Sequence, residues 1–300
     1  MEYKPELLPI ADDNLDDVYS FLAKNHNLPV TLKTWRETFN CKWIENKPNN
    51  GFMYKIGDNI VGVLVALYSD QFKNNKKYQL CNLCTWYVLK KYKNLSLKLI
   101  HHILSQKEFN YTTLTMDPRL IRLHKSFKFS SFSNTDFLYI PHYPKVFPTS
   151  YGLKYYSNLS DIQSILSLEA LKVSQHHETL RLVNQIAISD SNSSCLIMYI
   201  GGFARNLHYA NIIYISDPDF YYKYSFSVGS YLLLKKYKLY TRVLKSHLSH
   251  VPLISLKVQS RSSMMYRGES IDGEHPQEIY SESVLGAFIA PFSKDSLGCN

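Results

Sequence analysis

A cluster of lysines separates a strand-like run from a helical pattern in the first third of the chain. The strand-like run ends at Val88 within TWYVLKKYKNLSLKLIHHIL, residues 85–104, and the helical pattern begins near Asn94. The first turn of a helix leaves backbone N–H groups without partners, and the helix dipole adds partial positive charge there. Lysines next to such a helix start favour the binding of a phosphate group. The sequence therefore predicts an anion site at this junction.

The distribution of charge supports a positive surface around the junction. The net charge is +9, and residues 71–107 contain lysines but no acidic residue. A solvated basic surface and a local field for an anionic ligand are both compatible with this pattern. The surplus is lysine rather than arginine, and no predicted helix has the pattern of a nucleic-acid recognition element, which disfavours nucleic acid as a partner.

Paired cysteines and histidines do not form a metal-binding pattern. Cys81 and Cys84 form a CxxC inside an apolar run, and residues three apart on a strand point to opposite faces. His101 and His102 are adjacent on a predicted helix, where they diverge by about 100°. The five cysteines have no regular spacing, which argues against a disulfide framework. We expect no metal site.

The bulk properties indicate a soluble, cytoplasmic protein. No apolar run approaches the ~20 residues of a membrane-spanning helix, so we expect no membrane contact. The N-terminal stretch lacks the basic region and apolar core of a signal peptide. A hydrophobic fraction of 45% is sufficient for a packed core.

The elements expected to position the junction alternate between strands and helices. The first half reads as a helix, a hairpin, a strand, a helix, a strand, a helix and a strand: residues 14–25, 51–69, 78–88, 94–106, 111–116, 117–127 and 135–142. The second half reads as two helices, two strands, a helix and further strands: residues 159–172, 175–187, 195–202, 208–216 and 224–237, then the later runs. This order predicts an α/β fold with a mixed, mostly antiparallel sheet flanked by helices, duplicated in tandem as domains 1–145 and 146–300.

The element order and the junction resemble the GNAT superfamily of acyl-CoA-dependent N-acyltransferases. That family carries V-x-P-E-Y-R-G-x-G at this place, and the present chain reads VLKKYKNLS from Val88, with Tyr92 at the family's aromatic position. The departures are Lys93 for Arg or Gln, Asn94 and Ser96 for glycines, and Lys98 for Gly or Ala. Asn tolerates left-handed backbone and Ser is small, so both could still allow close approach of a pyrophosphate.

A second motif of the family also has a counterpart. The family often shows N-x-x-A-x-x-L-Y-E-K-x-G-F, and residues 117–129 read DPRLIRLHKSFKF, with Asp117 at the Asn, Leu120 at the Ala and His124 at the Tyr. The family tyrosine protonates the departing CoA thiolate, so the resemblance implies that His124 is the general acid. Histidine can donate a proton near neutral pH, since its ordinary pKa is about 6.5. An exposed helix histidine without a catalytic role is the alternative.

The resemblance covers about residues 6–143 and implies direct transfer of an acetyl or other short acyl group from acyl-CoA to an amine acceptor. The thioester would lie along the splayed end of the fourth strand, residues 83–88, whose N–H groups would polarise the carbonyl. The implied coenzyme contacts are Trp86, Tyr87, Val88, Lys93, Asn94, Leu95, Ser96, Leu97, Lys98, Asp117 and Leu120.

The sequence leaves two candidates for the general base. The family base is often a glutamate on or near the fourth strand, and this strand has none, so Asp70 acting through water is one candidate. An acid from the segment YRGESIDGEHPQEIYSES is the other; its acids are Glu269, Asp272, Glu274, Glu278 and Glu282, with Arg267 or Tyr280 as polar contacts. A solvated acidic loop is a further interpretation of that segment. Cys84 as an acylated nucleophile lacks an evident His–Asp partner.

The second half is expected to be a degenerate copy. The strand–loop–helix stretch 212–233 carries Asp217 and Asp219 where the first half carries lysines. Carboxylates repel a pyrophosphate, so this copy is not expected to bind CoA and would shape the acceptor side or support the fold. A catalytically degenerate module that binds CoA, protein or nucleic acid is the competing interpretation of the whole chain. The sequence makes no prediction about oligomeric state.

Overall fold

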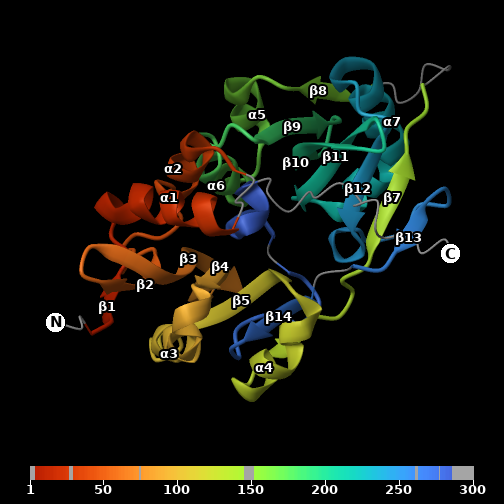
Figure 1. Cartoon of the computed structure of the whole chain (residues 1–300). Helices are drawn as coiled ribbons and strands as arrows, with labels where there is room; N and C mark the ends of the chain where they lie inside the picture. Colours follow the sequence, from red (N-terminus) through yellow and green to blue (C-terminus); the bar gives the residue numbers. More distant parts are fainter. Residues whose placement is uncertain are drawn as a thin grey trace, which may run out of the picture. The chain divides into compact units, whose positions relative to one another are not determined.

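The computed structural model describes residues 4–26, 30–73, 76–144, 152–260, 263–276 and 278–285 (Figure 1). The chain forms two compact units, each with its own seven-stranded sheet. The first unit is drawn from residues 1–132, 262–273 and 280–287, and the second from 133–261, 274–279 and 288–300. Mixed, mostly antiparallel sheets flanked by helices confirm the predicted α/β fold class.

The first unit has the strand order β1-β2-β3-β4-β5-β14-β6. Its strands are β1 (Glu6–Pro9), β2 (Gly51–Ile56), β3 (Asn59–Lys73), β4 (Lys76–Val88), β5 (Phe109–Met116), β6 (Ser130–Ser131) and β14 (Ser263–Arg267). β4 and β5 run parallel, whereas the other neighbours are antiparallel.

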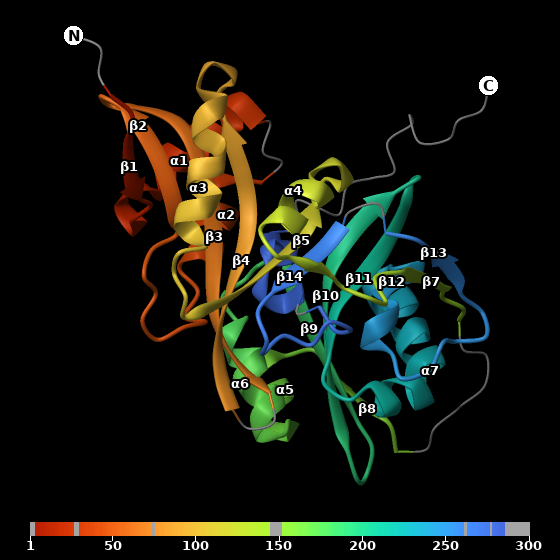
Figure 2. The same ribbon diagram turned by 90° about the horizontal axis from the view of Figure 1, so that it is seen from below.

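Helices cover both faces of the first sheet. They are α1 (Leu15–His26), α2 (Leu32–Phe39), α3 (Ser96–Ile103) and α4 (Ile121–Ser126), with 3-10 turns η1 (Asp12–Asn14), η2 (Lys90–Leu95), η3 (Pro118–Leu120) and η6 (Glu282–Leu285). Figure 1 shows α1 and α2 on one face and α3 and α4 on the other, and Figure 2 shows α3 along β2, β3 and β4. The apolar side of α3, including Leu99, Ile100 and Ile103, is buried against sheet residues such as Leu64 and Leu83.

The second unit has the strand order β13-β7-β12-β11-β10-β9-β8. Its strands are β7 (Phe137–Pro141), β8 (Lys154–Tyr156), β9 (Val183–Ser189), β10 (Ser194–Ala204), β11 (Leu207–Ile215), β12 (Tyr240–Leu244) and β13 (Leu256–Val258). Its helices are α5 (Leu159–Ile165), α6 (Leu168–His176) and α7 (Pro218–Lys236), and η4 (Lys245–His247) is a 3-10 turn of this unit. The 3-10 turn η5 (Glu278–Tyr280) is divided between the two units. β11 and β12 are the parallel neighbours here.

The predicted helix over 175–187 is wrong, because residues 183–189 form strand β9. Val183 is buried, Asn184 is exposed, and the strand pairs with both β8 and β10. Ser167 caps α6 by accepting a hydrogen bond from the Ala170 N–H, so the helices fall at 159–165 and 168–176 instead. Partner strands on both sides outweigh the weak local helical pattern.

The two sheets have matching strand orders, with one strand in each contributed by the other part of the sequence. β7 follows the first unit along the chain but pairs with β12 and β13, whereas β14 lies near the C-terminus but pairs with β5 and β6. Neither unit is therefore a contiguous half, and the boundary that we drew between residues 145 and 146 does not separate the sheets. The position of the parallel pair is the same in both sheets, which supports the predicted duplication.

The described helices include none that is long and apolar enough to cross a membrane.

Candidate functional site

β4 and β5 separate in the middle of the first sheet. Their parallel pairing runs from Gln79 opposite Phe109 to Asn82 opposite Thr112, yet β4 continues for six more residues, 83–88. β5 also continues, and it pairs there with β14. Residues 83–88 therefore have no partner on β5, and we call this break in the pairing the gap; it lies at the place where the sequence predicted a splayed strand end.

A bulge on β4 lies at the start of this gap. Ala66 of β3 opposes Leu83, whereas Leu64 opposes Trp86, so β4 has one extra residue at Cys84 and Thr85. A bulge re-aims the side chains that follow it and leaves a backbone group outside the ladder. Trp86 accordingly packs on the α3 side of the sheet, together with Leu83.

The segment around η6 fills part of the gap with a buried carboxylate. Glu282 is fully buried, and its Oε1 accepts a hydrogen bond from the Leu114 N–H at 3.3 Å. Its own N–H donates to Asn82 Oδ1 at 3.2 Å, and Asn82 Nδ2 donates to Thr112 Oγ1 at 3.0 Å. Glu282 thus takes the place of a strand acceptor for a β5 amide just beyond the last β4–β5 pair.

The other acids of that segment lie elsewhere. Glu269, Asp272 and Glu274 are exposed, and Glu278 lies in the second unit, with Oε2 at 3.8 Å from His247 Nδ1. Of the polar contacts suggested from sequence, Tyr280 packs edge-on against Trp43 and Arg267 continues the β14 ladder. Sequence reasoning therefore included Glu282 but could not separate it from its neighbours, and it missed Asn82. A polar residue at a strand position with apolar neighbours was the available signal for Asn82.

Cys84 is held as a neutral thiol. Burial raises the pKa of the Cys84 thiol well above its ordinary value, and the nearby Glu282 carboxylate raises this pKa further. The thiol lies 3.5 Å from Asn82 Oδ1 and 3.6 Å from the Asn82 carbonyl oxygen. Because the thiolate is the nucleophile, this environment argues against a covalent acyl-cysteine route.

His124 lies beside Trp86 on the α3 side of the sheet. It is 3% exposed, its ring centroid is 6.2 Å from that of Trp86, and its Nδ1 is 3.1 Å from the Leu120 carbonyl oxygen. The exposed-histidine alternative is therefore wrong. Burial lowers the pKa of His124, which favours the neutral ring. A carbonyl can only accept, so Nδ1 carries the proton and Nε2 of the neutral ring can accept but not donate.

Trp86 presents an unused donor at the same place. Its Nε1 atom is buried and has no hydrogen-bond partner among the described residues. A buried N–H without a partner costs free energy unless a ligand or water accepts from it. Tyr87 points to the other face, where its ring lies 5.9 Å from that of Phe21, and Val88 packs on the α3 side.

The lysine-rich junction is helical over a longer stretch than predicted. η2 begins at Lys90, is kinked at Tyr92 and leads into α3 at Ser96, whereas we expected the helix to open at Asn94. The Tyr92 N–H donates to the Leu89 carbonyl oxygen and the Ser96 N–H donates to that of Lys93. Asn94 keeps a negative φ, so the left-handed backbone that glycine would supply is not formed. The amides that start η2, at Lys90 and Lys91, precede the kink and have no acceptor within that turn.

The side chains of the junction divide into core and surface groups. Leu95 is 4% exposed and belongs to the core, so only its backbone is available to a ligand. Lys93, Asn94 and Lys98 are exposed, Leu97 is 51% exposed, and Ser96 is half-buried. The first turns of η2 and α3 contain no acidic residue.

Asp117 and Leu120 lie where the second motif predicted, at η3 and the start of α4. Asp117 caps η3 by accepting from the Arg119 N–H at 2.9 Å and forms an ion pair with the Arg119 guanidinium. That side chain lowers the pKa of Asp117 to about 2. Leu120 is exposed, and its carbonyl oxygen holds His124.

Asp70 is not brought to the gap. It opposes Gln79 in the β3–β4 ladder and forms an ion pair with Lys77 at 2.9 Å. Leu83, where the gap begins, opposes Ala66, and Val88 opposes Gly62, so Asp70 lies about 13 Å along the strand from the start of the gap and about 26 Å from its far end. A direct role of Asp70 at the junction is therefore incompatible with the register.

Comparisons with known proteins agree on the fold. No protein-family model and no curated protein sequence matches the chain. Among solved structures, a GCN5-related N-acetyltransferase from Anabaena variabilis is similar with a TM-score of 0.58 at 13% identity, covering 88% of this chain and 72% of that one. A GCN5-related N-acetyltransferase from Kribbella flavida gives a TM-score of 0.54 at 10% identity, with 88% and 71% covered. N-myristoyltransferase from Saccharomyces cerevisiae, solved with bound myristoyl-CoA, gives 0.51 at 12% identity, with 92% and 83% covered.

The chain thus has the fold of the GNAT superfamily, and these matches extend over both units. The resemblance first recognised in two short motifs is confirmed at the level of the fold. No group of three or more His, Cys, Asp or Glu residues in the described part of the chain converges on a metal position.

Proposed function

We propose that the first unit transfers a short acyl group from acyl-CoA directly to an amine. The observation that carries this proposal is the gap between β4 and β5, with a bulge at its start and a lysine-rich helix start at its end. The gap supplies strand amides that are not committed to a β5 partner. Such amides stabilise the oxyanion that forms when a nucleophile attacks a thioester carbonyl.

The lysine side chains at the junction support a CoA phosphate site. Lys90, Lys91, Lys93 and Lys98 are exposed over two consecutive helical turns, and the helix dipoles there add to their field. The unpartnered Trp86 Nε1–H fits a ligand carbonyl that would lie beside residues 83–88. These residues fit an elongated ligand with an anionic end and a polar, amide-like stem.

The reaction that follows is a simple exchange at the carbonyl carbon. The amine nitrogen forms a C–N bond, the C–S bond breaks, and the electron pair leaves with the CoA sulfur. The amine also loses one proton, and we assign Glu282 as the carboxylate that accepts it in place of Asp70. Glu282 lies at the gap and is already oriented by the Leu114 N–H.

His124 has a different place in this proposal from the one that the family tyrosine would give it. Its neutral ring carries the proton on Nδ1, toward Leu120, so protonation of the thiolate by His124 requires the imidazolium that burial disfavours. We therefore assign His124 a packing role against Trp86. The departing sulfur receives, by way of solvent, the proton that the amine released.

The second candidate function is a module that binds CoA without catalysis. One observation favours it: the junction forms 3-10 turns with a kink at Tyr92, and Asn94 keeps a negative φ, so the glycine-dependent loop that the family motif supplies is not formed.

Ligand stabilisation followed by turnover distinguishes the two functions. Acetyl-CoA at about 100 times its Kd should add about 2.7 kcal/mol to the free energy of unfolding. Release of free thiol with a panel of amines would then identify the transferase. Stabilisation without thiol release would identify the binding module, and no stabilisation by acetyl-CoA would contradict both.

A further inference from the structure

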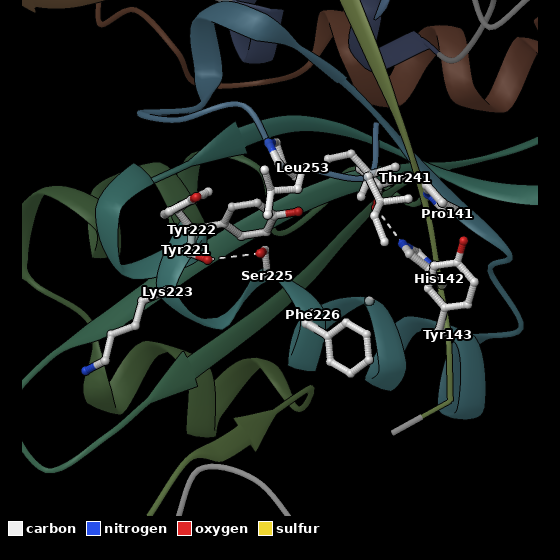
Figure 3. Close-up of a pocket in the computed structure, with 14 residues that line it drawn as sticks. Pro141, His142, Tyr143, Tyr221, Tyr222, Lys223, Ser225, Phe226, Thr241 and Leu253 are labelled. Atoms are coloured by element: carbon white, nitrogen blue, oxygen red, sulfur yellow. Dashed lines mark hydrogen bonds between the residues drawn. The ribbon is translucent and has the colours of Figure 1, made fainter. Parts of the chain in front are cut away.

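The second unit contains an open cavity of about 400 Å³ beside α7. Its walls come from the end of β7, one face of α7 and the segment that precedes β13, as Figure 3 shows. Six of the lining residues are Ile140, Tyr143, Tyr221, Phe226, Leu253 and Ile254. The volume falls in the range of small-molecule sites, and the wall is mainly aromatic and aliphatic.

The cavity has a topological origin. In the first unit, β5 is followed by α4, and Ile121 and Phe127 from that region pack on the core cluster beside α3. In the second unit, β12 is followed by η4 and by irregular chain over residues 248–255, all of which the structure describes. The second unit thus lacks a helix equivalent to α4, and the space beside α7 stays open.

The polar groups in the wall are already engaged within the protein. His142 Nδ1 is 2.7 Å from the Lys238 carbonyl oxygen, and its Nε2 is 2.8 Å from Thr241 Oγ1. Nδ1 therefore donates to the carbonyl, and burial lowers the pKa of His142, which favours the neutral ring whose Nε2 accepts from the threonine hydroxyl. Gly229 lets the ring lie close to α7, because a Cβ there would meet His142 Cδ2 at 2.9 Å.

Two further polar side chains of the wall, Ser225 and Lys223, also have partners within the protein. Ser225 donates to the Tyr222 carbonyl oxygen at 2.9 Å, and the Lys223 ammonium lies 3.5 Å from Asp190 Oδ2. A carboxylate or phosphate placed inside would lose its hydration without gaining a matched donor, and this costs several kcal/mol. The chemistry of the wall therefore favours a neutral ligand over a buried anion.

Apolar side chains gather at the mouth of the cavity. Leu253 is 101% exposed, Ile254 62% and Phe226 55%. The hydroxyls of the exposed Tyr143 and Tyr222 lie among the lining residues and suit an uncharged polar tip. A ligand with an apolar body would cover this surface as it enters.

We propose that this cavity binds an uncharged, mainly apolar small molecule: an aromatic ring or a short alkyl chain with at most one neutral polar end. The proposal rests on the cavity wall of the second unit alone and does not depend on acyl transfer by the first unit.

Binding of a neutral fluorescent probe to the full-length chain tests the proposal. N-phenyl-1-naphthylamine should bind saturably, and 1-octanol should displace it about tenfold more effectively than octanoate, whose carboxylate has no donor inside. Ser225→Trp places a large ring in the cavity and should weaken probe binding at least about tenfold. Leu234→Trp on the same helix, at an exposed residue outside the cavity, is the matched control and should leave probe binding unchanged.

A second variant keeps the test decisive if Ser225→Trp fails to fold. Replacing Leu253 and Ile254 by serine removes apolar surface only at the exposed mouth, and it should weaken probe binding several-fold while the unfolding midpoint stays constant.

Absence of probe binding, equal binding by the filled variant, or stronger displacement by octanoate would each overturn the proposal. A concentration-dependent dimer that blocks the probe would instead assign the cavity to a second copy of the chain. Stabilisation by acetyl-CoA should be the same in Ser225→Trp and wild type, which separates this test from that of the transferase.

Discussion

The two strand-to-helix junctions of the molecule occupy equivalent places in matching sheets but have opposite electrostatics. In the first unit, β4 leads through η2 into α3, and the helix start carries lysines and no carboxylate. In the second unit, β11 leads into α7, whose N-cap Asp217 accepts a hydrogen bond from the Phe220 N–H at 2.9 Å.

The difference shows how the same topology gives one helix start that can bind an external anion and one that is capped by a carboxylate of the chain itself. An external anion at a helix start needs free N–H groups and a positive field. In α7 the carboxylate of Asp217 already occupies that position, Pro218 contributes no N–H, and Asp219 adds further negative charge. The second junction is thus satisfied by the chain itself, whereas the first can accept a ligand.

The largest expected effect comes from the carboxylate that lies in the gap of the first sheet. Glu282→Gln keeps an acceptor for the Leu114 N–H but removes the charge, so the free energy of unfolding should change by about 1 kcal/mol or less while kcat falls about 100-fold. Glu282→Ala should also lose about 3 kcal/mol of stability, because it leaves a buried amide without its acceptor and opens a cavity. Urea denaturation and thiol-release assays measure the two effects. Full activity in Glu282→Gln would show that the residue only holds the strands apart.

Replacing the lysines of the first junction by carboxylates, as in the second, should remove its ability to bind an anion. The triple change of Lys90, Lys91 and Lys93 to Glu should weaken acetyl-CoA binding by more than about tenfold, and the salt dependence of binding should decrease. Isothermal titration at low and high salt measures both. The matched control changes three exposed lysines to Glu, Lys24 on α1, Lys33 on α2 and Lys42 in the chain after α2, and should bind as wild type does. Equal loss in both triple variants would mean that only net charge matters.

Removing the built-in anion of the second junction should cost stability without creating a CoA site. Asp217→Ala should lower the free energy of unfolding by about 1 kcal/mol, because the Phe220 N–H loses its acceptor, whereas Asp217→Asn should retain most of the cap. Chemical denaturation compares the two variants. A new CoA-dependent stabilisation in Asp217→Ala would show that the carboxylate alone had closed this junction.

The smallest effect concerns two of the histidines whose pKa burial lowers, His124 in the first unit and His142 in the second. Burial lowers the pKa of each below the ordinary value of about 6.5, so the unfolded chain binds more protons than the folded one. Their contribution to stability is therefore present above pH 6.5 and is lost as the pH falls through the folded pKa. Unfolding curves between pH 8 and pH 4 should show a shallower decline in His124→Gln than in wild type.

The same His124→Gln variant tests the acid role that the family motif suggested. Because Nε2 of the neutral ring has no proton, kcat at pH 7.5 should stay within about threefold of wild type. If kcat of the wild type falls at alkaline pH and kcat of His124→Gln does not, this assignment would be contradicted and His124 would again be the acid.

Local patterns in the sequence were sufficient for the elements whose formation depends on neighbouring residues. The lysines after Val88 and the cap at Asp117 lie within a few residues of the structure that they determine. Hydrophobic periodicity also placed the turn of the hairpin and the buried face of α3, whereas the predicted start of the helix at residue 224 is wrong, because Asp217 caps α7 and the helix begins at Pro218. These features are local because helix caps and dipoles act over one turn.

Only the tertiary structure decided which strands meet and what fills the gap. Glu282 and Leu114 are 168 positions apart, and neither residue type nor spacing indicates that a carboxylate would replace a strand partner there. The same holds for β7, whose apolar pattern predicts a strand but not the sheet to which it belongs, and for β14, which the sequence pattern did not predict as a strand. Strand pairing is set by the packing of both faces and by chain connectivity, so it is a property of the whole fold. The sequence by itself determined the elements and the charge of the two junctions, and the fold decided the carboxylate and the opening in which the proposed chemistry takes place.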